Sequence, residues 1–320
     1  MGRILYNVVT KGAVSGGHKM AVRHVETLRE LGFDAVCYLA AGSVAPAWFA
    51  HTAPFEVTPR IQPDDIVVIA DDATRAMQAL APTQIRTVVF SQNPYLCAAW
   101  AFDVLDRFAP DRFPHVIAVS QGLGATIARA YPQAGVDIVP CFADERLFAP
   151  ARDKAFEVCF APRKRPLEAQ AIPQFLRKLH PRHGDLAWTE LNDVAEARMA
   201  EALGRSALFL SLNRLESVGM TTLEAMASGC LCAGFTGVGG LEYATPQNGL
   251  WAPDEDCEAA ADALAAAADL VRSGGPALDA CLEAARETAR LWSYARFRGA
   301  LEETWTRLAP EMRRLPTWTG

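Results

Sequence analysis

Short apolar runs alternate with segments of helical spacing along the whole chain, and this alternation restricts the fold more than any other feature. In the first half the apolar runs cover residues 4–9, 35–39, 66–70, 87–91, 116–119 and 136–139. In the second half they cover residues 155–160, 186–188, 207–211, 230–235 and 249–251. Parallel strands joined by crossover helices produce this order, so we predict an α/β fold with two doubly wound parallel sheets.

The expected domain boundary lies where both periodicities break, at Phe148-Ala-Pro-Ala-Arg-Asp153. A proline-containing break of this kind is typical of a linker. We therefore expect residues 1–150 to form one domain, residues 151–291 a second, and residues 292–320 a terminal helical segment. This last segment carries Phe297, Leu301, Trp305 and Leu308 at helical spacing, an apolar stripe that must be buried.

Composition excludes several classes of protein. The formal net charge is −6 over 320 residues, so the chain lacks the basic field that nucleic-acid binding requires. No apolar run reaches membrane-spanning length, and the apolar run over the first nine residues is too short and too polar for a signal peptide. We therefore expect a cytoplasmic protein. The eight cysteines are scattered, which argues against a disulfide framework and against a zinc site.

The most informative segment runs from Glu216 to Gly229, between two predicted strands. Glu216 falls in the loop after a strand, at the sheet edge where open α/β folds bind ligands. Glu224 falls inside the following helix. Gly219 permits close approach of the backbone, and the first free N–H groups of the helix favour an anion such as a diphosphate. Without this context, the better interpretation of the two acids would be a solvated loop residue and an ordinary helix carboxylate.

Two further segments follow predicted strands. Arg163-Lys164-Arg165 comes after the first strand of the second half, where the three cations could clamp a diphosphate; a solvated charge run is the alternative. Gly16-Gly17 separates the first strand from the first helix, where the backbone can approach an anionic or sugar ligand. The adjoining His18 and Lys19 could face the same ligand.

These segments resemble the retaining GT-B glycosyltransferases, in particular glycosyltransferase family 4. Glu216 and Glu224 match the E-x7-E motif of that family, in the setting Glu-Ser-Val-Gly…Leu-Glu-Ala-Met-Ala-Ser-Gly. Further similar segments are Ser15-Gly-Gly-His-Lys-Met-Ala-Val22, Val116-Ile-Ala-Val-Ser120, Val139-Pro-Cys-Phe-Ala-Asp144, Gly237-Val-Gly-Gly-Leu-Glu242 and Asn248-Gly-Leu-Trp-Ala-Pro253. The resemblance implies two Rossmann-like domains with an inter-domain cleft and a last helix that crosses back onto the first domain.

The resemblance also implies roles for single residues. It places Glu216 at the donor sugar and Glu224 at the nucleotide ribose. The expected donor-binding set is Gly16, Gly17, Arg163, Lys164, Arg165, Glu216, Ser217, Val218, Gly219, Met220 and Glu224, with Glu216, Arg163 and Lys164 acting in catalysis. On the acceptor side the candidates are His18, Lys19, Gln92 and Asn93.

The sequence departs from the family at two places. Relatives commonly have a lysine five residues after the arginine, whereas counting from Arg163 leads to Glu168. Many relatives have a histidine where this chain has Phe90-Ser-Gln-Asn-Pro94, and neither Gln92 nor Asn93 is a strong base. The family's same-face attack, in which the donor phosphate takes the acceptor proton, is therefore the implied route.

The resulting interpretation is a retaining glycosyltransferase that moves a sugar from a nucleotide-diphosphate-sugar to a glycan, lipid-linked or small-molecule acceptor. It needs no metal and no other cofactor, binds no nucleic acid, and leaves room for peripheral association with the inner face of the membrane. The alternatives are a non-catalytic protein that binds nucleotide-sugar or glycan, and a GT-B sugar-nucleotide epimerase. Asp254-Glu-Asp256 spells a metal-binding D-x-D pattern but opens a predicted helix, so we interpret it as structural.

Overall fold

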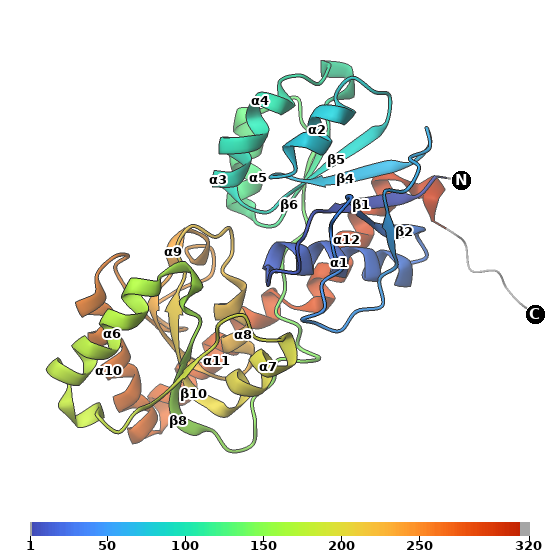
Figure 1. Cartoon of the computed structure of the whole chain (residues 1–320). Coiled ribbons are helices and arrows are strands. Elements are labelled where there is room, and N and C mark those ends of the chain that lie inside the picture. Colours follow the sequence, from blue (N-terminus) through green and yellow to red (C-terminus); the bar gives the residue numbers. More distant parts are fainter. Residues whose placement is uncertain (1, 314–320) are drawn as a thin grey trace, which may run out of the picture. The chain divides into compact units, whose positions relative to one another are not determined.

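The structure is a computed structural model that describes residues 2–313. The chain divides into two compact units, one comprising Met1–Cys141 with Phe297–Gly320 and the other Phe142–Arg296 (Figure 1). Each unit holds a parallel sheet with crossover helices, which confirms the predicted α/β class.

Within the described residues, the first unit has a seven-stranded sheet of order β3-β2-β1-β4-β5-β6-β7, in which every pair is parallel. Its strands are β1 (Ile4–Val8), β2 (Ala35–Leu39), β3 (Phe55–Val57), β4 (Ile66–Ala70), β5 (Arg86–Ser91), β6 (His115–Ala118) and β7 (Val136–Ile138). Its helices are α1 (Gly16–Glu30), α2 (Thr74–Leu80), α3 (Pro94–Leu96), α4 (Phe102–Leu105), α5 (Gln121–Ala130) and most of α12 (Tyr294–Leu308), with a π-helical turn at Cys97–Ala101.

The second unit, all of whose residues are described, has a five-stranded parallel sheet of order β12-β11-β10-β8-β9. Its strands are β8 (Ala155–Phe160), β9 (Ala187–Glu190), β10 (Ser206–Leu212), β11 (Leu231–Phe235) and β12 (Leu250–Ala252). Its α-helices are α6 (Pro166–Leu179), α7 (Glu196–Arg205), α8 (Met220–Ala227), α9 (Gly237–Gly240), α10 (Cys257–Ser273) and α11 (Pro276–Leu291).

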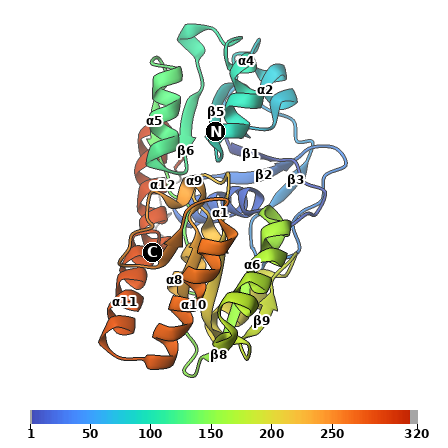
Figure 2. The ribbon, with the colours of Figure 1, turned by 90° about the vertical axis from the view of Figure 1, so that its left-hand side faces the viewer.

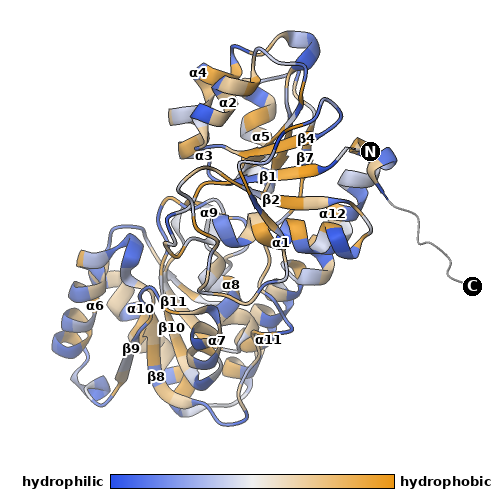
Figure 3. Ribbon diagram, turned by 45° about the vertical axis from the view of Figure 1, so that its right-hand side comes forward, coloured by the Kyte–Doolittle hydropathy of each residue, from blue (hydrophilic) through white to orange (hydrophobic). Residues whose placement is uncertain are grey.

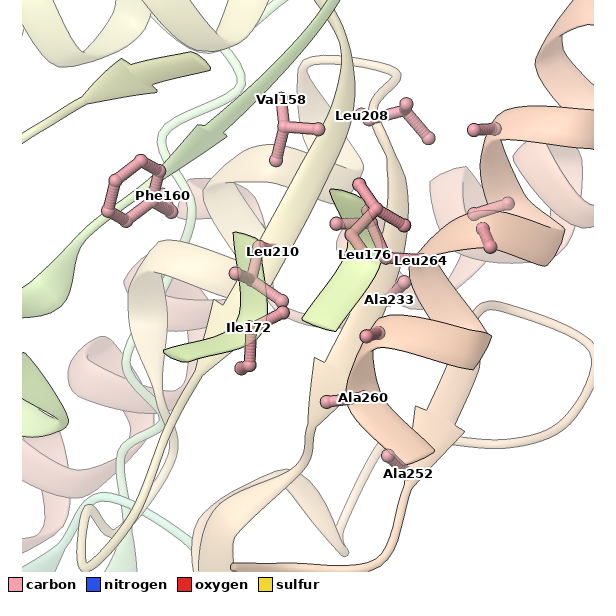
Figure 4. Packing of buried hydrophobic residues seen from close by; sticks show 14 of the residues in the cluster. Val158, Phe160, Ile172, Leu176, Leu208, Leu210, Ala233, Ala252, Ala260 and Leu264 are labelled. Atoms are coloured by element: carbon pink, nitrogen blue, oxygen red, sulfur yellow. The ribbon is translucent and has the colours of Figure 1, made fainter. Parts of the chain in front are cut away.

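The core of the second unit lies between its sheet and the pair α6 and α10, which run side by side (Figure 2). Val158 of β8 and Leu208 and Leu210 of β10 meet Ile172 of α6 and Leu264 of α10, all fully buried (Figure 4). Hydrophobic residues concentrate in the strands (Figure 3). Burial of this kind contributes about 25 cal/mol per Å² of apolar surface, which is the main force that holds the sheet edge and its loops in place.

The apolar stripe of the last helix is buried on the first unit. Phe297, Leu301 and Trp305 of α12 are fully buried. The ring of Trp305 lies 6.3 Å from that of Tyr6 in β1, and the ring of Phe297 lies 5.0 Å from that of His24 in α1. The chain that returns from the second unit therefore completes the core of the first.

The boundary between the units falls between Cys141 and Phe142, earlier than the expected linker at residue 150. The intervening segment is hydrogen-bonded to the second unit: the N–H of Ala143 donates to the carbonyl of Trp292, and the N–H of Ala151 donates to that of Gly204. Phe148 is also buried. Sequence periodicity marks the end of regular elements, but these contacts decide to which unit an irregular segment belongs.

Candidate functional site

The strand order of the second unit marks one edge position as a ligand site. From β8 the chain goes to β9 on one side, and then returns past β8 to β10, β11 and β12 on the other. β8 and β10 are thus the neighbouring strands at which the direction of winding reverses. In open α/β sheets, ligands bind at this switch point, outside the carboxyl ends of the strands. The loops that follow β8 and β10 contain Arg163-Lys164-Arg165 and the Glu216 segment.

The structure brings Lys164 and Glu216 together across the switch point. The ammonium nitrogen of Lys164 lies 3.7 Å from Oε1 of Glu216, and both side chains keep partial access to solvent. The other oxygen, Oε2 of Glu216, accepts a hydrogen bond of 2.6 Å from the backbone N–H of Arg214. Arg163 is exposed in the same short turn as Lys164. This edge therefore presents two cations and one carboxylate that can meet a ligand.

Arg165 has a different place from its two neighbours. Its side chain is 1% exposed and lies inside the unit, where the guanidinium stacks on the ring of Phe235 at 4.4 Å. Its Nε donates to the carbonyl of Asn213 at 2.8 Å. Its remaining nitrogens meet Glu168, Asp254 and Glu255. The expectation that Arg165 clamps a diphosphate is corrected, because its hydrogen-bonding groups are already used within the protein.

The loop from β10 to α8 is held by a buried hydrogen-bond network. The amide of Asn213 donates to Oγ1 of Thr222 at 3.0 Å and to the hydroxyl of Tyr243 at 3.3 Å. The hydroxyl of Tyr243 in turn donates to the carbonyl of Gly219 at 3.1 Å. Gly219 itself has φ +77°. A Cβ at this position would lie 2.3 Å from Nδ2 of Asn213, so both the conformation and the space require glycine.

Helix α8 starts directly after this loop, with no side chain capping its first turn. The free N–H groups of such a helix start carry partial positive charge and suit an anion. Ser217 and Val218 are buried beside it, and the hydroxyl of Ser217 has no hydrogen-bond partner in the structure. Met220 is half-buried, and Glu224 is buried within α8. Glu216 and Glu224 are therefore placed differently: one is partly exposed at the sheet edge and the other lies within the unit.

The glycine-rich segment of α9 packs onto the back of the Glu216 loop. A Cβ on Gly239 would lie 2.3 Å from the carbonyl carbon of Ser217. The N–H of Val238 donates to the carbonyl of Arg214 at 2.9 Å. These contacts explain the run of glycines by close backbone packing. The acidic triplet is likewise engaged: Asp256 caps α10 through a hydrogen bond to the N–H of Ala259, while Asp254 and Glu255 bind Arg165.

The first unit has its own switch point, between β1 and β4. Gly16 and Gly17 open α1 there. A Cβ on Gly17 would lie 3.0 Å from Oε1 of Gln92, so the side chain of Gln92 rests against the glycine turn. His18 is half-buried next to it, and burial lowers the pKa of its imidazole, with Asp72 acting in the opposite direction. The Nδ1 atom of His18 is buried without a hydrogen-bond partner.

The other two acceptor-side candidates are engaged in the fold. The carboxamide oxygen of Asn93 accepts from the N–H groups of Tyr95 and Leu96 and so caps α3. Lys19 is buried, with 7% of its surface exposed. The side chains of Asn93 and Lys19 are therefore used within the fold, whereas those of Gln92 and His18 lie at the switch point.

Sequence reasoning missed Asp71. This carboxylate follows β4 and is 2% exposed. Its Oδ2 accepts hydrogen bonds from the N–H of Gln92, the N–H of Asn93 and the hydroxyl of Ser91. Burial raises its pKa to about 6, against the opposing effect of these donors. An acidic pair, Asp71-Asp72, directly after an apolar strand was the signal that could have found it.

Among residues 2–313, no group of three or more histidine, cysteine, aspartate or glutamate side chains is arranged to hold a metal ion. No helix in the described part of the chain has the length and apolarity needed to cross a membrane.

The known proteins that resemble this chain in sequence are glycosyltransferases. The family model of the glycosyl transferases group 1 matches residues 163–269, the segment that holds both loops of the β8–β10 switch point. An alpha-1,6-glucosyltransferase of Actinobacillus pleuropneumoniae serotype 7 (strain AP76) is 24% identical over 234 residues, which cover 70% of this chain and 69% of that protein.

Solved structures share the fold over almost the whole chain. HepE of Anabaena, in complex with UDP, aligns with a TM-score of 0.67 at 15% identity, over 95% of this chain and 100% of that one. Sucrose-phosphate synthase of Thermosynechococcus elongatus aligns with a TM-score of 0.70 at 12% identity, over 97% of this chain and 100% of that one. The chain is a glycosyltransferase of the GT-B fold, and its segment 163–269 is similar to the glycosyl transferases group 1.

Proposed function

We propose that this protein is a retaining glycosyltransferase that transfers a sugar from a nucleoside diphosphate sugar to an acceptor hydroxyl without the help of a metal ion. One observation carries the proposal: the pair Lys164 and Glu216, 3.7 Å apart, lies at the switch point beside the uncapped start of α8. A cation and free N–H groups suit a diphosphate, and a nearby carboxylate suits the hydroxyls of a sugar.

The leaving diphosphate is the group that most needs stabilisation. When the bond between C1 of the sugar and the phosphate oxygen breaks, negative charge grows on that oxygen. Arg163, Lys164 and the first N–H groups of α8 neutralise it, because preorganised cations and dipoles act on charge that develops in the transition state. Fixed cations of this kind also do the work that a divalent metal does in other transferases. Arg165 has no part in this step, because its nitrogens are already bound within the protein.

The two carboxylates hold the rest of the donor. Glu216 accepts hydrogen bonds from sugar hydroxyls, and Glu224 accepts them from the nucleotide ribose, the roles that the E-x7-E resemblance implies. Oε2 of Glu216 is held by the N–H of Arg214, so its orientation is set before the donor arrives. A preorganised carboxylate loses little entropy on binding, which favours interactions that strengthen in the transition state.

The proton route follows from the residues after β5, where neither Gln92 nor Asn93 is a strong base. The acceptor oxygen attacks C1 from the face that the phosphate leaves. The acceptor proton passes to the departing phosphate oxygen, so charge balances without an enzymic base and the anomeric configuration is retained. Gln92 and His18 are the side chains that we expect to orient the acceptor or the sugar, since Asn93 and Lys19 are engaged elsewhere.

Two similar proteins support the choice of donor. HepE of Anabaena was solved with UDP-glucose, and the relative from Actinobacillus pleuropneumoniae is a glucosyltransferase. We therefore propose a uridine diphosphate hexose as donor and UDP-glucose as the first compound to test. The acceptor class, whether a glycan, a lipid-linked glycan or a small molecule, is left to experiment.

The test is a panel of nucleotide-sugars incubated with the purified protein, with release of nucleoside diphosphate as the readout and proton NMR of the transferred sugar for its anomeric configuration. We expect slow release from one donor, an α-linked product from an α-linked donor, and full activity in excess EDTA. A β-linked product, a covalent sugar trapped on Glu216, or activity lost to EDTA would contradict the proposal. Binding without release would favour a non-catalytic protein, and interconversion of the sugar without transfer would favour an epimerase.

A further inference from the structure

Arg165 joins three loops at the carboxyl edge of the second sheet. It stands at the end of the loop after β8. From there its Nε reaches the carbonyl of Asn213, the first residue after β10, at 2.8 Å. Its other nitrogens reach Asp254 at 3.1 Å and Glu255 at 2.9 Å, in the loop after β12. A single guanidinium thus connects the loops that follow β8, β10 and β12. It can do so because its N–H donors are planar and point in fixed directions.

The second loop in this arrangement carries the proposed sugar carboxylate. Asn213 precedes Glu216 by three positions, and its amide is tied to Thr222 in α8. Arg214, between them, donates its N–H to Glu216 and lies 3.4 Å from Glu255, the same carboxylate that Arg165 binds. The position of Glu216 is therefore coupled to Arg165 by way of Asn213 on one side and Glu255 on the other.

The first loop carries the proposed diphosphate cation. Lys164 is the residue directly before Arg165, and its ammonium faces Glu216. Burial of Arg165 therefore fixes the backbone from which Lys164 extends. Because Arg165 also holds Asn213, the bond between these two residues sets how far apart the loop of Lys164 and the loop of Glu216 can lie.

The energetic cost of burying the charge of Arg165 indicates that this residue does more than stabilise the fold. A buried charge loses its hydration, and apolar side chains of similar volume often replace a buried ionic cluster without loss of stability. Glu255 is also held at φ +68°, in the left-handed region that a residue other than glycine seldom adopts. Charge, strain and hydrogen bonds therefore converge on the loops of the switch point.

We infer that Arg165 is a positioning residue, which sets the separation of Lys164 and Glu216 and thereby the rate of sugar transfer, while it leaves nucleotide affinity largely to Arg163 and Lys164. The inference rests on the proposed function for its effect on transfer. The mechanical part, that Arg165 orders residues 213–219, stands without it.

The test compares Arg165→Met and Arg165→Lys with Arg163→Met, a matched variant that removes an exposed cation two positions away. The first readout is amide hydrogen exchange of residues 213–219 with no ligand present. We expect exchange in this loop to become at least about tenfold faster in Arg165→Met and less so in Arg165→Lys, with no change in the strands of the first unit. Arg163→Met leaves the exchange of the loop unchanged.

The second readout is the release of UDP from UDP-glucose. A displacement of about 1 Å costs about 100-fold in rate, so we expect Arg165→Met to lower kcat about 100-fold with KM changed less than about threefold. Arg165→Lys recovers part of kcat. Arg163→Met raises KM for UDP-glucose and weakens the binding of UDP. This split separates a positioning residue from a diphosphate ligand.

Each of the two readouts can contradict the inference independently of the other. Unchanged exchange at residues 213–219 in a folded Arg165→Met protein overturns the inference, and so does a rise in KM as large as that of Arg163→Met. If the wild-type protein releases no nucleotide from any donor, the proposed function fails and the exchange readout alone decides on Arg165. Should Arg165→Met not fold, Glu255→Gln and Asp254→Asn remove single partners of the guanidinium, and faster exchange in the same loop is again the expected result.

Discussion

The ammonium of Lys164 and the carboxylate of Glu216 face one another at 3.7 Å, although 51 residues separate them in the sequence. The two strands that bring them together, β8 and β10, are hydrogen-bonded neighbours at which the winding of the sheet reverses. Parallel strands point their carboxyl ends to one edge, so groups that follow different strands meet there. The strand order of the sheet thus determines the place of the proposed donor site, and single residues determine its chemistry.

Replacement of Lys164 by methionine tests the cation of this pair. A fixed charge that stabilises a leaving group is typically worth 10²–10³-fold in rate, so we expect Lys164→Met to lower kcat/KM for the nucleotide-sugar by about 100-fold. A partly exposed ion pair adds about 0–1 kcal/mol to folding, so the unfolding midpoint should hardly move. Lys178→Met, an exposed lysine near the end of α6, is the matched control and should keep full activity. Equal activity of the two variants would remove Lys164 from the site.

The glycine at the start of α8 gives a prediction about stability. Gly219→Ala places a methyl group 2.3 Å from Nδ2 of Asn213 at a φ of +77°. The left-handed conformation alone costs roughly 1–2 kcal/mol, and the clash adds to it, so we expect a lower free energy of unfolding and a loss of turnover. Chemical denaturation is the measurement.

Gly299 in α12 supplies the comparison for that variant. A Cβ there would meet nothing within 4 Å. Alanine is favoured over glycine inside a helix by about 1 kcal/mol, so Gly299→Ala should stabilise the protein and leave activity unchanged. If Gly219→Ala were as stable as the wild type, the loop would not have the rigid conformation described above.

Asp71 gives a prediction about pH. Burial raises its pKa in the folded state to about 6, whereas its reference value is 3.8. Between these two values the folded protein binds a proton that the unfolded chain does not, so this group lowers the stability as the pH rises from about 4 to about 6. At 1.36 kcal/mol for each unit of pKa, the loss approaches about 3 kcal/mol above pH 6.

Asp71→Asn removes this titration. The difference in unfolding free energy between variant and wild type should therefore change with pH in that window and be constant above it. Denaturant unfolding from pH 4 to pH 8 measures it. Parallel curves for the two proteins would show that Asp71 does not titrate with a raised pKa. A control is Asp153→Asn, which removes an exposed carboxylate just before β8.

Much of the fold could be predicted because its signal is periodic. Nine of the eleven predicted apolar runs overlap by at least three residues with strands of the structure, and the other two, residues 186–188 and 249–251, overlap by two residues with β9 and β12. The strand β3 was missed because it has only Phe55–Val57, lies at the sheet edge and is partly or fully exposed, so it leaves no buried pattern.

The site was predicted less completely, for reasons that concern side-chain direction. Three consecutive basic residues follow β8, but only the structure shows that the turn sends Arg163 and Lys164 outward. Arg165 turns inward, toward Asp254 and Glu255, which lie 89 and 90 positions further along the chain. Asn93 could serve an acceptor or cap a helix, and its capping role depends on where α3 starts. Asp71 went unnoticed because its partners are backbone N–H groups, which no motif records.

The most direct test of the account is turnover of the nucleotide-sugar by the wild type, by Glu216→Gln and by Glu224→Gln, with Glu201→Gln on the surface of α7 as control. We expect Glu216→Gln to lower kcat about 100-fold or more, Glu224→Gln to act mainly through weaker binding of the nucleotide, and Glu201→Gln to behave as the wild type. If both acids proved dispensable while the protein still turned over its donor, the site would lie elsewhere and the account would be wrong.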